Sequence, residues 1–240
     1  MQKQQDKIGL ALLGVFIFLG LACLGYLLGH AALAYKQFDR SVTVKGLSER
    51  EFLADIVIWP IQFNVASNDL GELYQMLDGQ TSQIRAYLRS NGIGANEISV
   101  STPAITDKSA QQYGNEAQVA YRYTAFQTVT VYSSEIENVR AVMGSLSELG
   151  KQGIVFTGDA YQTQTEYLFT RLNEIKPGMI EEATTNAREV AQKFASDSDS
   201  TLGKIRKASQ GQFSISARDK NNPHIKKIRV VSTVEYYLSD

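Results

Sequence analysis

The sequence predicts an α+β fold: an N-terminal transmembrane helix, then a folded domain with a mixed, largely antiparallel β-sheet and three main helices. Three observations predict it. A long apolar run opens the chain, segments of strand-like and helix-like periodicity follow, and the strand-like segments come mostly in pairs. Pairs of strands interspersed with helices are typical of α+β proteins rather than of a strictly alternating parallel sheet.

The apolar run has no charged residue from Ile8 to Gly29 and continues, interrupted only by His30, to Tyr35. A helix needs about 20 apolar residues to cross a bilayer. We therefore expect a short tail over residues 1–7, a signal-anchor helix over residues 8–35 that contacts the lipid bilayer, and one folded domain over residues 36–240. Residues 32–34 also form an acceptable small-x-small cleavage site, so a removed signal peptide and a soluble periplasmic protein stay open.

Charge and cysteine content narrow the function classes. The chain has 24 Lys and Arg against 25 Asp and Glu, so its net charge of −1 gives no general attraction to nucleic acid. Lysines stand on both sides of the apolar run, so charge alone does not decide its orientation. The one cysteine, Cys23, lies inside the run, which leaves the folded part without a disulfide.

Periodicity places the elements of the first half. Two strands are expected over residues 41–47 and 52–66, joined by a polar turn at residues 48–51. Asp69 is expected to cap a helix that Asn91-Gly92 ends. Two further strands should follow, around a polar loop at residues 109–117, and then a second helix. Their expected ranges are 97–108 and 119–132 for the strands and 135–149 for the helix.

The second half continues with a strand from residue 154 to about 165 and then the longest helix. We expect Pro177 in the first turn of this helix, where a missing N–H costs nothing. The side expected to face inward carries residues that repeat at helical spacing to about Ala195: Ile180, Ala183, Ala187, Val190 or Ala191, and Phe194. The alanines among them let the helix lie very close to its neighbour. Two final strands are expected over residues 204–217 and 225–238.

Residues that commonly carry chemistry are few. The two histidines, His30 and His224, share no expected element; we expect the first at the membrane interface and the second in a solvated loop. No Gly-x-Ser-x-Gly turn presents a serine, and no glycine-rich loop precedes a helix. We therefore expect no catalytic residue, no cofactor and no metal site, and a protein that is not an enzyme.

Three groups of residues are candidates for interactions. Gly25 and Gly29 offer a small-xxx-small face for helix packing in the membrane. Six basic residues near the C-terminus would form one band if the last strands pair; the band either guards a strand edge or docks an anionic partner. Tyrosines serve either the core and sheet surface or an oligomer interface. The basic residues are Lys204, Arg206, Lys207, Lys226, Lys227 and Arg229, and the interface tyrosines are Tyr121, Tyr123, Tyr132, Tyr236 and Tyr237.

Four segments resemble the SIMPL-domain family in their order and spacing. They are the opening VTVKGLSER at residues 42–50 with Asp55, YLFTRLNEIKP at residues 167–177, the region from Glu182 to Ile205, and RVVSTVEYYL at residues 229–238. The resemblance runs from about Ser41 to the end of the chain. It implies similarity to the bacterial periplasmic immunogenic or oxidative-stress defence group, which is exported or anchored and forms ring- or channel-like homo-oligomers. No catalytic residue is established for that family, so none is carried over.

These observations favour a single-pass protein of the bacterial inner membrane, with a non-catalytic periplasmic domain that assembles with itself into a ring or channel. A role in cell-envelope stress protection would follow from the resemblance alone. Two alternatives stay open: an envelope adaptor whose basic band docks an anionic partner, and an uncharacterised hydrolase or redox enzyme, whose catalytic group would need a strongly perturbed pKa.

Overall fold

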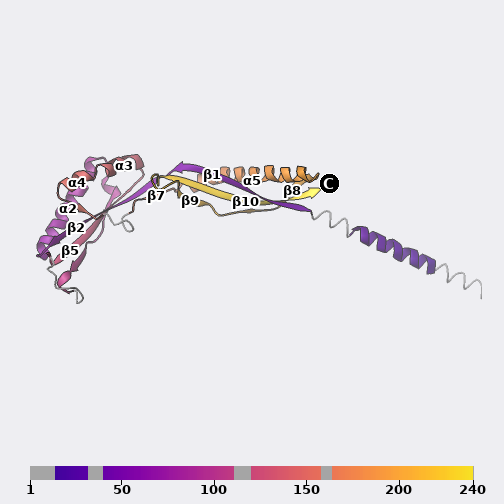
Figure 1. Ribbon diagram of the computed structural model, residues 1–240, viewed down its shortest axis with the longest axis horizontal. Helices are drawn as coiled ribbons and strands as arrows, with labels where there is room; N and C mark the ends of the chain where they lie inside the picture. Colours follow the sequence, from indigo (N-terminus) through magenta and orange to yellow (C-terminus); the bar gives the residue numbers. More distant parts are fainter. Residues whose placement is uncertain (1–13, 32–39, 111–119, 158–163, 240) are drawn as a thin grey trace, which may run out of the picture. The chain divides into compact units, whose positions relative to one another are not determined.

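The computed structural model describes residues 14–31, 40–110, 120–157 and 164–239 (Figure 1). The chain divides into two compact units: unit 1 comprises residues 1–49, 176–213 and 229–240, and unit 2 comprises residues 50–175 and 214–228. Each unit has its own cluster of buried apolar side chains. The tail 1–7, both ends of the expected span and most of the expected loop 109–117 lie outside the described residues.

The apolar run forms a helix over Gly14–Ala31, with a mean hydropathy of 1.8 across these 18 residues. By length and composition this helix can cross a membrane, and its place near the N-terminus fits either an anchor or a signal sequence. Gly25 and Gly29 lie on it, and both are exposed.

Unit 2 is built around a sheet in the order β3-β5-β2-β6, with β4 also paired with β5 and β7 with β2. The central pair, β2 and β5, is antiparallel, with Ile61 opposite Val129. Helices α2, α3 and α4 complete the unit. The bounds are β2 Ile56–Ser67, α2 Leu70–Ser90, β3 Ile98–Val100, β4 Ala104–Asp107, β5 Tyr123–Ser133, α3 Ile136–Gly144, α4 Ser147–Lys151, β6 Val155–Phe156 and β7 Glu166–Leu168.

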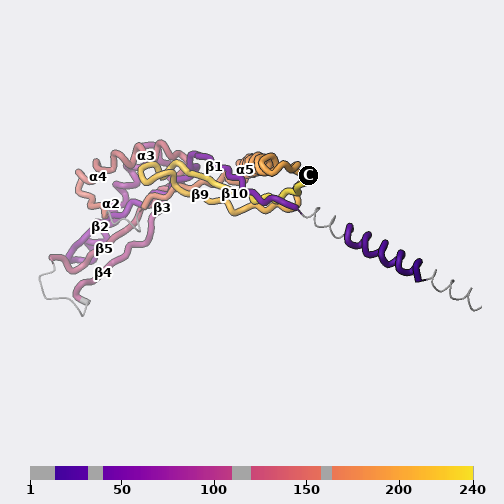
Figure 2. Tube along the Cα trace, turned by 45° about the vertical axis from the view of Figure 1, so that its right-hand side comes forward, coloured from indigo at the N-terminus to yellow at the C-terminus, as the bar shows by residue number. Residues whose placement is uncertain are grey.

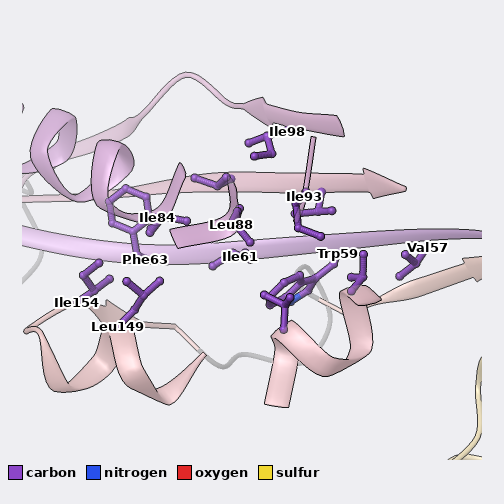
Figure 3. Close-up of a cluster of buried hydrophobic side chains, with 14 of the residues drawn as sticks. Val57, Trp59, Ile61, Phe63, Ile84, Leu88, Ile93, Ile98, Leu149 and Ile154 are labelled. Atoms are coloured by element: carbon purple, nitrogen blue, oxygen red, sulfur yellow. The ribbon is translucent and has the colours of Figure 1, made fainter. Parts of the chain in front are cut away.

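The core of unit 2 lies between β2 and the helices. Alternate residues of β2 are buried, and Trp59 and Phe63 are the largest of them (Figure 3). They pack in one cluster with Ile84 and Leu88 of α2, which recur at four-residue spacing on one side of that helix. At its start, the Asp69 carboxylate accepts the N–H of Glu72 at 2.8 Å, which confirms the predicted cap.

Unit 1 contains most of a sheet in the order β1-β10-β8, with β9 also paired with β10. Helix α5 lies along β1 and β10 in both views (Figures 1 and 2). The bounds are β1 Ser41–Leu53, α5 Leu172–Asp197, β8 Thr201–Gln210, β9 Ser214–Ala217 and β10 Ile225–Ser239. The division between the units falls within β1, α5 and β10.

The contact between α5 and β1 is unusually close. Ala183, Ala187 and Ala191 are fully buried in a stripe along α5, and Gly46 of β1 lies against this stripe. A Cβ atom built on Gly46 would overlap the carbonyl oxygen of Ala183 and the backbone nitrogen of Ala187. Small residues on both elements are therefore needed for the helix and the strand to approach this closely.

The α+β class is confirmed, with antiparallel pairing in two sheets rather than one. The predicted turn at residues 48–51 is wrong. Strand β1 continues through these residues to Leu53, and Ala54-Asp55 separates it from β2. Ser48 is polar but buried, and its hydroxyl donates to Glu182 at 2.9 Å. The hydroxyl of Ser48, a residue type common in turns, thus finds its hydrogen-bond partner far away in the sequence.

Other boundaries also differ from the predictions. Pro177 does not stand in the first turn of α5, which begins five residues earlier at Leu172. The expected helix 135–149 is divided into α3 and α4, with Ser145 ending α3. The expected strand 97–108 is divided into β3 and β4 on either side of Pro103, which has no N–H to offer a sheet.

Replacing Gly46 with alanine tests the close contact. Because the added methyl group meets backbone atoms of α5, we expect Gly46→Ala to lower the free energy of unfolding by about 1–3 kcal/mol. Denaturant titration of the full chain measures this. Gly79→Ala is the matched control, since a Cβ at this helical position meets nothing within 4 Å. Equal stability of Gly46→Ala and the natural protein would contradict the contact.

Candidate functional site

The clearest exposed apolar surface of unit 1 lies along one flank of α5. Asn186, Val190 and Phe194 follow one another at four-residue spacing, so they form one stripe beside the alanines. The Asn186 amide donates to the carbonyl oxygen of Leu47 at 2.8 Å, which places this flank at β1. Val190 is 42% exposed and Phe194 is 55% exposed. Since they follow Asn186 on the same stripe, both side chains stand on the side of α5 that faces the outer edge of β1.

Charged side chains border this apolar pair. Glu189 and Lys193 line an open hollow of about 310 Å³ together with Val190 and Phe194. The two charges stand four residues apart on the same helix. The flank is therefore an apolar patch with a charged rim, as in many protein interaction surfaces.

The sheet below the helix has two open edges. Among the described strands, β1 and β8 each pair only with β10. Strand β8 is ten residues long, and every residue except Leu202 is exposed. One of them, Ile205, is a large apolar side chain at 48% exposure. A long edge strand that is uncovered on both faces is the kind of element that pairs with another chain.

The six basic residues fall into two groups in the chain. Three lie on β8, where Lys207 is paired with Glu235 of β10, and three stand among the first residues of β10. Arg206 forms an ion pair with Glu235 at 3.0 Å, and Arg229 one with Glu49 at 3.9 Å. These carboxylates reduce the positive potential that an anionic partner would meet.

The remaining members of the basic group differ in environment. Lys204 and Lys207 are exposed on β8. Lys226 is partly buried, and this burial lowers its pKa, against the opposing effect of Glu166. The docking of an anionic partner stays a prediction, with Lys204 and Lys207 as the most accessible members of the group.

The five tyrosines also occupy different places. Tyr121, Tyr132 and Tyr237 are exposed, and the guanidinium of Arg122 lies over the ring of Tyr123 at 4.8 Å. Tyr236 is only 2% exposed and packs with Val44, Val234 and the alanines of α5. Tyr236 therefore belongs to the core of unit 1, while the exposed tyrosines stay available to a partner.

Asp55 organises the chain just before α5. Its carboxylate accepts the backbone N–H of Thr170 at 2.9 Å, the hydroxyl of Thr170 at 3.1 Å and the backbone N–H of Arg171 at 3.2 Å. Burial alone would raise the pKa of Asp55, but these donors outweigh it, so the pKa lies below the ordinary 3.8. The carboxylate thus fixes the backbone at the point where α5 begins, which explains why the helix starts before Pro177.

His224 is not solvated as predicted. It is 7% exposed, and its ring centroid lies 6.0 Å from that of Tyr167. Its backbone carbonyl accepts the N–H of Ala54 at 2.8 Å, which holds the residue against the end of β1. The Nδ1 atom is buried and has no hydrogen-bond partner in the part of the chain that the structure describes. Burial lowers the pKa of His224, with a further lowering by Arg140.

No group of three His, Cys, Asp or Glu side chains in the described ranges is placed to hold a metal ion. Asp55 is saturated with donors from its own chain, and His224 packs against Tyr167. The arrangement of unit 1 instead suits the addition of a strand: an open ladder on β1, an apolar flank of α5 above it and an exposed strand at the opposite edge.

Sequence reasoning missed or misplaced several of these residues. Helical spacing predicted Val190 and Phe194 on the inner side of α5 with the alanines, and this is wrong, because they are 42% and 55% exposed. Ile205 gave no comparable signal, because its exposure depends on which strand ends the sheet. The partners of Asp55 lie 115 and 116 residues away along the chain, so no local pattern predicts them.

Asp55→Asn tests the cap before α5. The amide keeps the shape but loses the charge that accepts the donors of Thr170 and Arg171, so we expect a loss of about 1–3 kcal/mol in the free energy of unfolding near pH 7. The lowered pKa stabilises the fold above pH 3.8, and this contribution is lost as the pH falls through the folded-state pKa. Denaturant titrations at pH 7 and pH 3 measure both effects. Asp78→Asn, at an exposed position of α2, is the control and should change little.

His224 predicts a second pH dependence. Its pKa in the folded chain lies below the ordinary 6.5, so the unfolded chain binds more protons once the pH falls below that value. The contribution of His224 to the free energy of unfolding is therefore fully present above pH 6.5 and is lost as the pH falls through the folded-state pKa. The ring of Tyr167 packs beside His224. The charges of Arg140 and Arg218 lower the pKa of His224 further, and those of Glu137 and Asp219 raise it.

The measurement is the free energy of unfolding between pH 7.5 and pH 5.0 for the natural chain and for His224→Leu. We expect a shallower decline in the variant, by up to about 1.4 kcal/mol per pH unit. The other histidine, His30, lies in the apolar helix and serves as an internal control through His30→Leu. Parallel curves for the natural chain and His224→Leu would contradict the assignment.

Comparison with known proteins gives one positive finding. The family model named SIMPL, described as a protein of unknown function (DUF541), matches residues 42–235. A search of curated proteins finds no match. The matched range begins in β1, ends in β10 and contains both units. Because it covers most of the sequence, the chain belongs to the SIMPL family.

Proposed function

We propose that this chain is a non-catalytic protein of the bacterial cell envelope, tethered in the inner membrane by its N-terminal helix, whose periplasmic domain assembles with itself into a closed ring or channel. A role in protecting the envelope under stress is part of the proposal and rests on the family resemblance alone. The observation that carries self-assembly is the pair of open edges, β1 and β8, in one sheet.

The physical argument concerns strand edges. Backbone N–H and C=O groups on an open edge pair readily with another strand. Soluble proteins usually shorten, twist or cover such edges, whereas β8 is long and exposed along its length. Cyclic closure of identical copies pairs every edge without leaving one at the end.

The tether supports the same conclusion. The helix Gly14–Ala31 is long and apolar enough to span a bilayer. Copies held in one membrane share an orientation and a high local concentration, so weak contacts between them are sufficient for assembly. Gly25 and Gly29 stand four residues apart on this helix, and a Cβ at either would meet nothing within 4 Å in the described chain, so they offer helix packing a close approach.

The mass of the full-length protein tests the proposal. After extraction in mild detergent at micromolar concentration, light scattering should give one species at a whole multiple of the chain mass. Intact-mass spectrometry of the membrane fraction should find the apolar helix still attached. A monodisperse monomer would refute self-assembly, and a mature chain that begins after Ala34 would refute the tether.

A further inference from the structure

Helix α5 does not lie centrally over its sheet: it covers β1 and β10 but not β8. The buried alanines of α5 cluster with Val44 of β1 and with Val234 and Tyr236 of β10. The helix therefore covers these two strands, while β8 beyond them, apart from Leu202, is exposed on both faces. On the opposite side, where β1 ends the sheet, Val190 and Phe194 are left exposed and are not covered by any strand that the structure describes. At one edge of the sheet, strand β8 has no helix over it. At the other edge, apolar side chains of α5 have no strand beneath them.

These two features are complementary. We propose that β8 of one copy pairs with the outer edge of β1 in the next copy, beneath Val190 and Phe194 of that next copy. The proposal deepens the self-assembly described above and rests on it, because it names the surfaces that the copies use.

The side chains of β8 fit this position. Ile205 is paired with Tyr236, and Ala208 with Val234, so both face the side of the sheet that α5 covers. When β8 is added to the β1 edge of another copy, Ile205 turns toward Val190 and Phe194. Three apolar side chains that are 42–55% exposed in one chain would then bury one another.

The strand directions also fit. Strands β10 and β8 are antiparallel, and the arrows of β1 and β10 point in opposite directions in Figure 1, so β8 and β1 run the same way. Copies related by rotation about an axis that runs along the strands keep this direction, and the new pair is parallel. Since the two surfaces differ, the contact is heterologous, and such contacts close into rings when the rotation allows it.

The length of the new ladder is limited on one side. The Asn186 amide occupies the carbonyl of Leu47, so a strand can add to β1 only over residues 41–46. Val190 and Phe194 are the next two members of the Asn186 stripe. Because residues 46–48 of β1 contact residues 182–187 of α5, the two elements run in opposite directions, and Val190 and Phe194 lie over this open stretch.

Disulfide cross-linking tests the contact. Ser41 donates to Glu235, which is paired with Lys207, so residues 43 and 45 share a sheet face with Lys207. In a Cys23→Ser background, Lys207→Cys is combined with Thr43→Cys or with Lys45→Cys. Within one chain these positions stand two strand spacings apart, roughly 10 Å, which is too far for a disulfide. Bonds can therefore form only between copies.

We expect at least one double variant to give a ladder of covalent multimers on mild oxidation in the membrane. Each single-cysteine variant should give dimers at most, and Lys207→Cys with Asp78→Cys is the matched control pair. A normal oligomer mass with no ladder from either double variant would overturn the β8-to-β1 contact and leave self-assembly standing. A monomeric mass would overturn both.

Phe194→Glu provides an independent arm. The side chain is exposed within one chain, so the variant should fold with an unchanged circular dichroism spectrum and lose the oligomer. Phe126→Glu, on the exposed side of β5 in unit 2, is the control at 44% exposure and should keep the oligomer. An oligomer of unchanged mass in Phe194→Glu would count against the contact.

Discussion

The close approach of α5 to β1 at Gly46 is the contact on which the arrangement of unit 1 depends. Alanine side chains bury little area each, so the gain from this helix comes from close packing: at Gly46 the backbone of Ala183 and Ala187 leaves no room for a Cβ atom. Two polar links run along the same line, from Ser48 to Glu182 and from Asn186 to Leu47. Together they hold α5 in a defined position on the sheet, and that position decides which strands are covered.

The two units differ in how they bury their apolar side chains. Unit 2 packs large side chains such as Phe63, Leu73 and Leu88 between a sheet and three helices, with each of them essentially inaccessible. Unit 1 has a smaller core, formed mainly by valines, one tyrosine and alanines. A single helix covers only part of its sheet. Unit 2 is therefore complete within one chain, whereas unit 1 leaves backbone and apolar surface that another copy can cover.

Much of the fold was predictable because the relevant forces are local. The periodicity of α2, its Asp69 cap and the alternation of β5 all follow from side chains a few residues apart. The alanine spacing of α5 also predicted a close neighbour. The errors arose where a distant partner decides the outcome. Ser48 resembles a turn residue until Glu182 satisfies its hydroxyl, and Pro177 resembles a helix start until Asp55 fixes an earlier one.

The candidate site was less predictable than the fold for the same reason. Tyr236 and Tyr237 are neighbours on β10 and point to opposite faces of the sheet, and only the position of α5 decides which of them is buried. The basic residues suggested a single band, but their carboxylate partners come from other strands. The exposure of β8 depends on the order of strands in the sheet and on the width of α5. No local sequence pattern predicts either of these.

The amide of Asn186 has a consequence for alignment. Side chains on a strand alternate between the two faces of a sheet, so a slip of one residue sends every side chain to the wrong face. By occupying the carbonyl of Leu47, Asn186 puts a fixed stop at one end of the open stretch of β1. An incoming strand cannot slide beyond that stop. In the proposed assembly, a single side chain of the helix therefore limits how far a strand of another molecule can extend along β1.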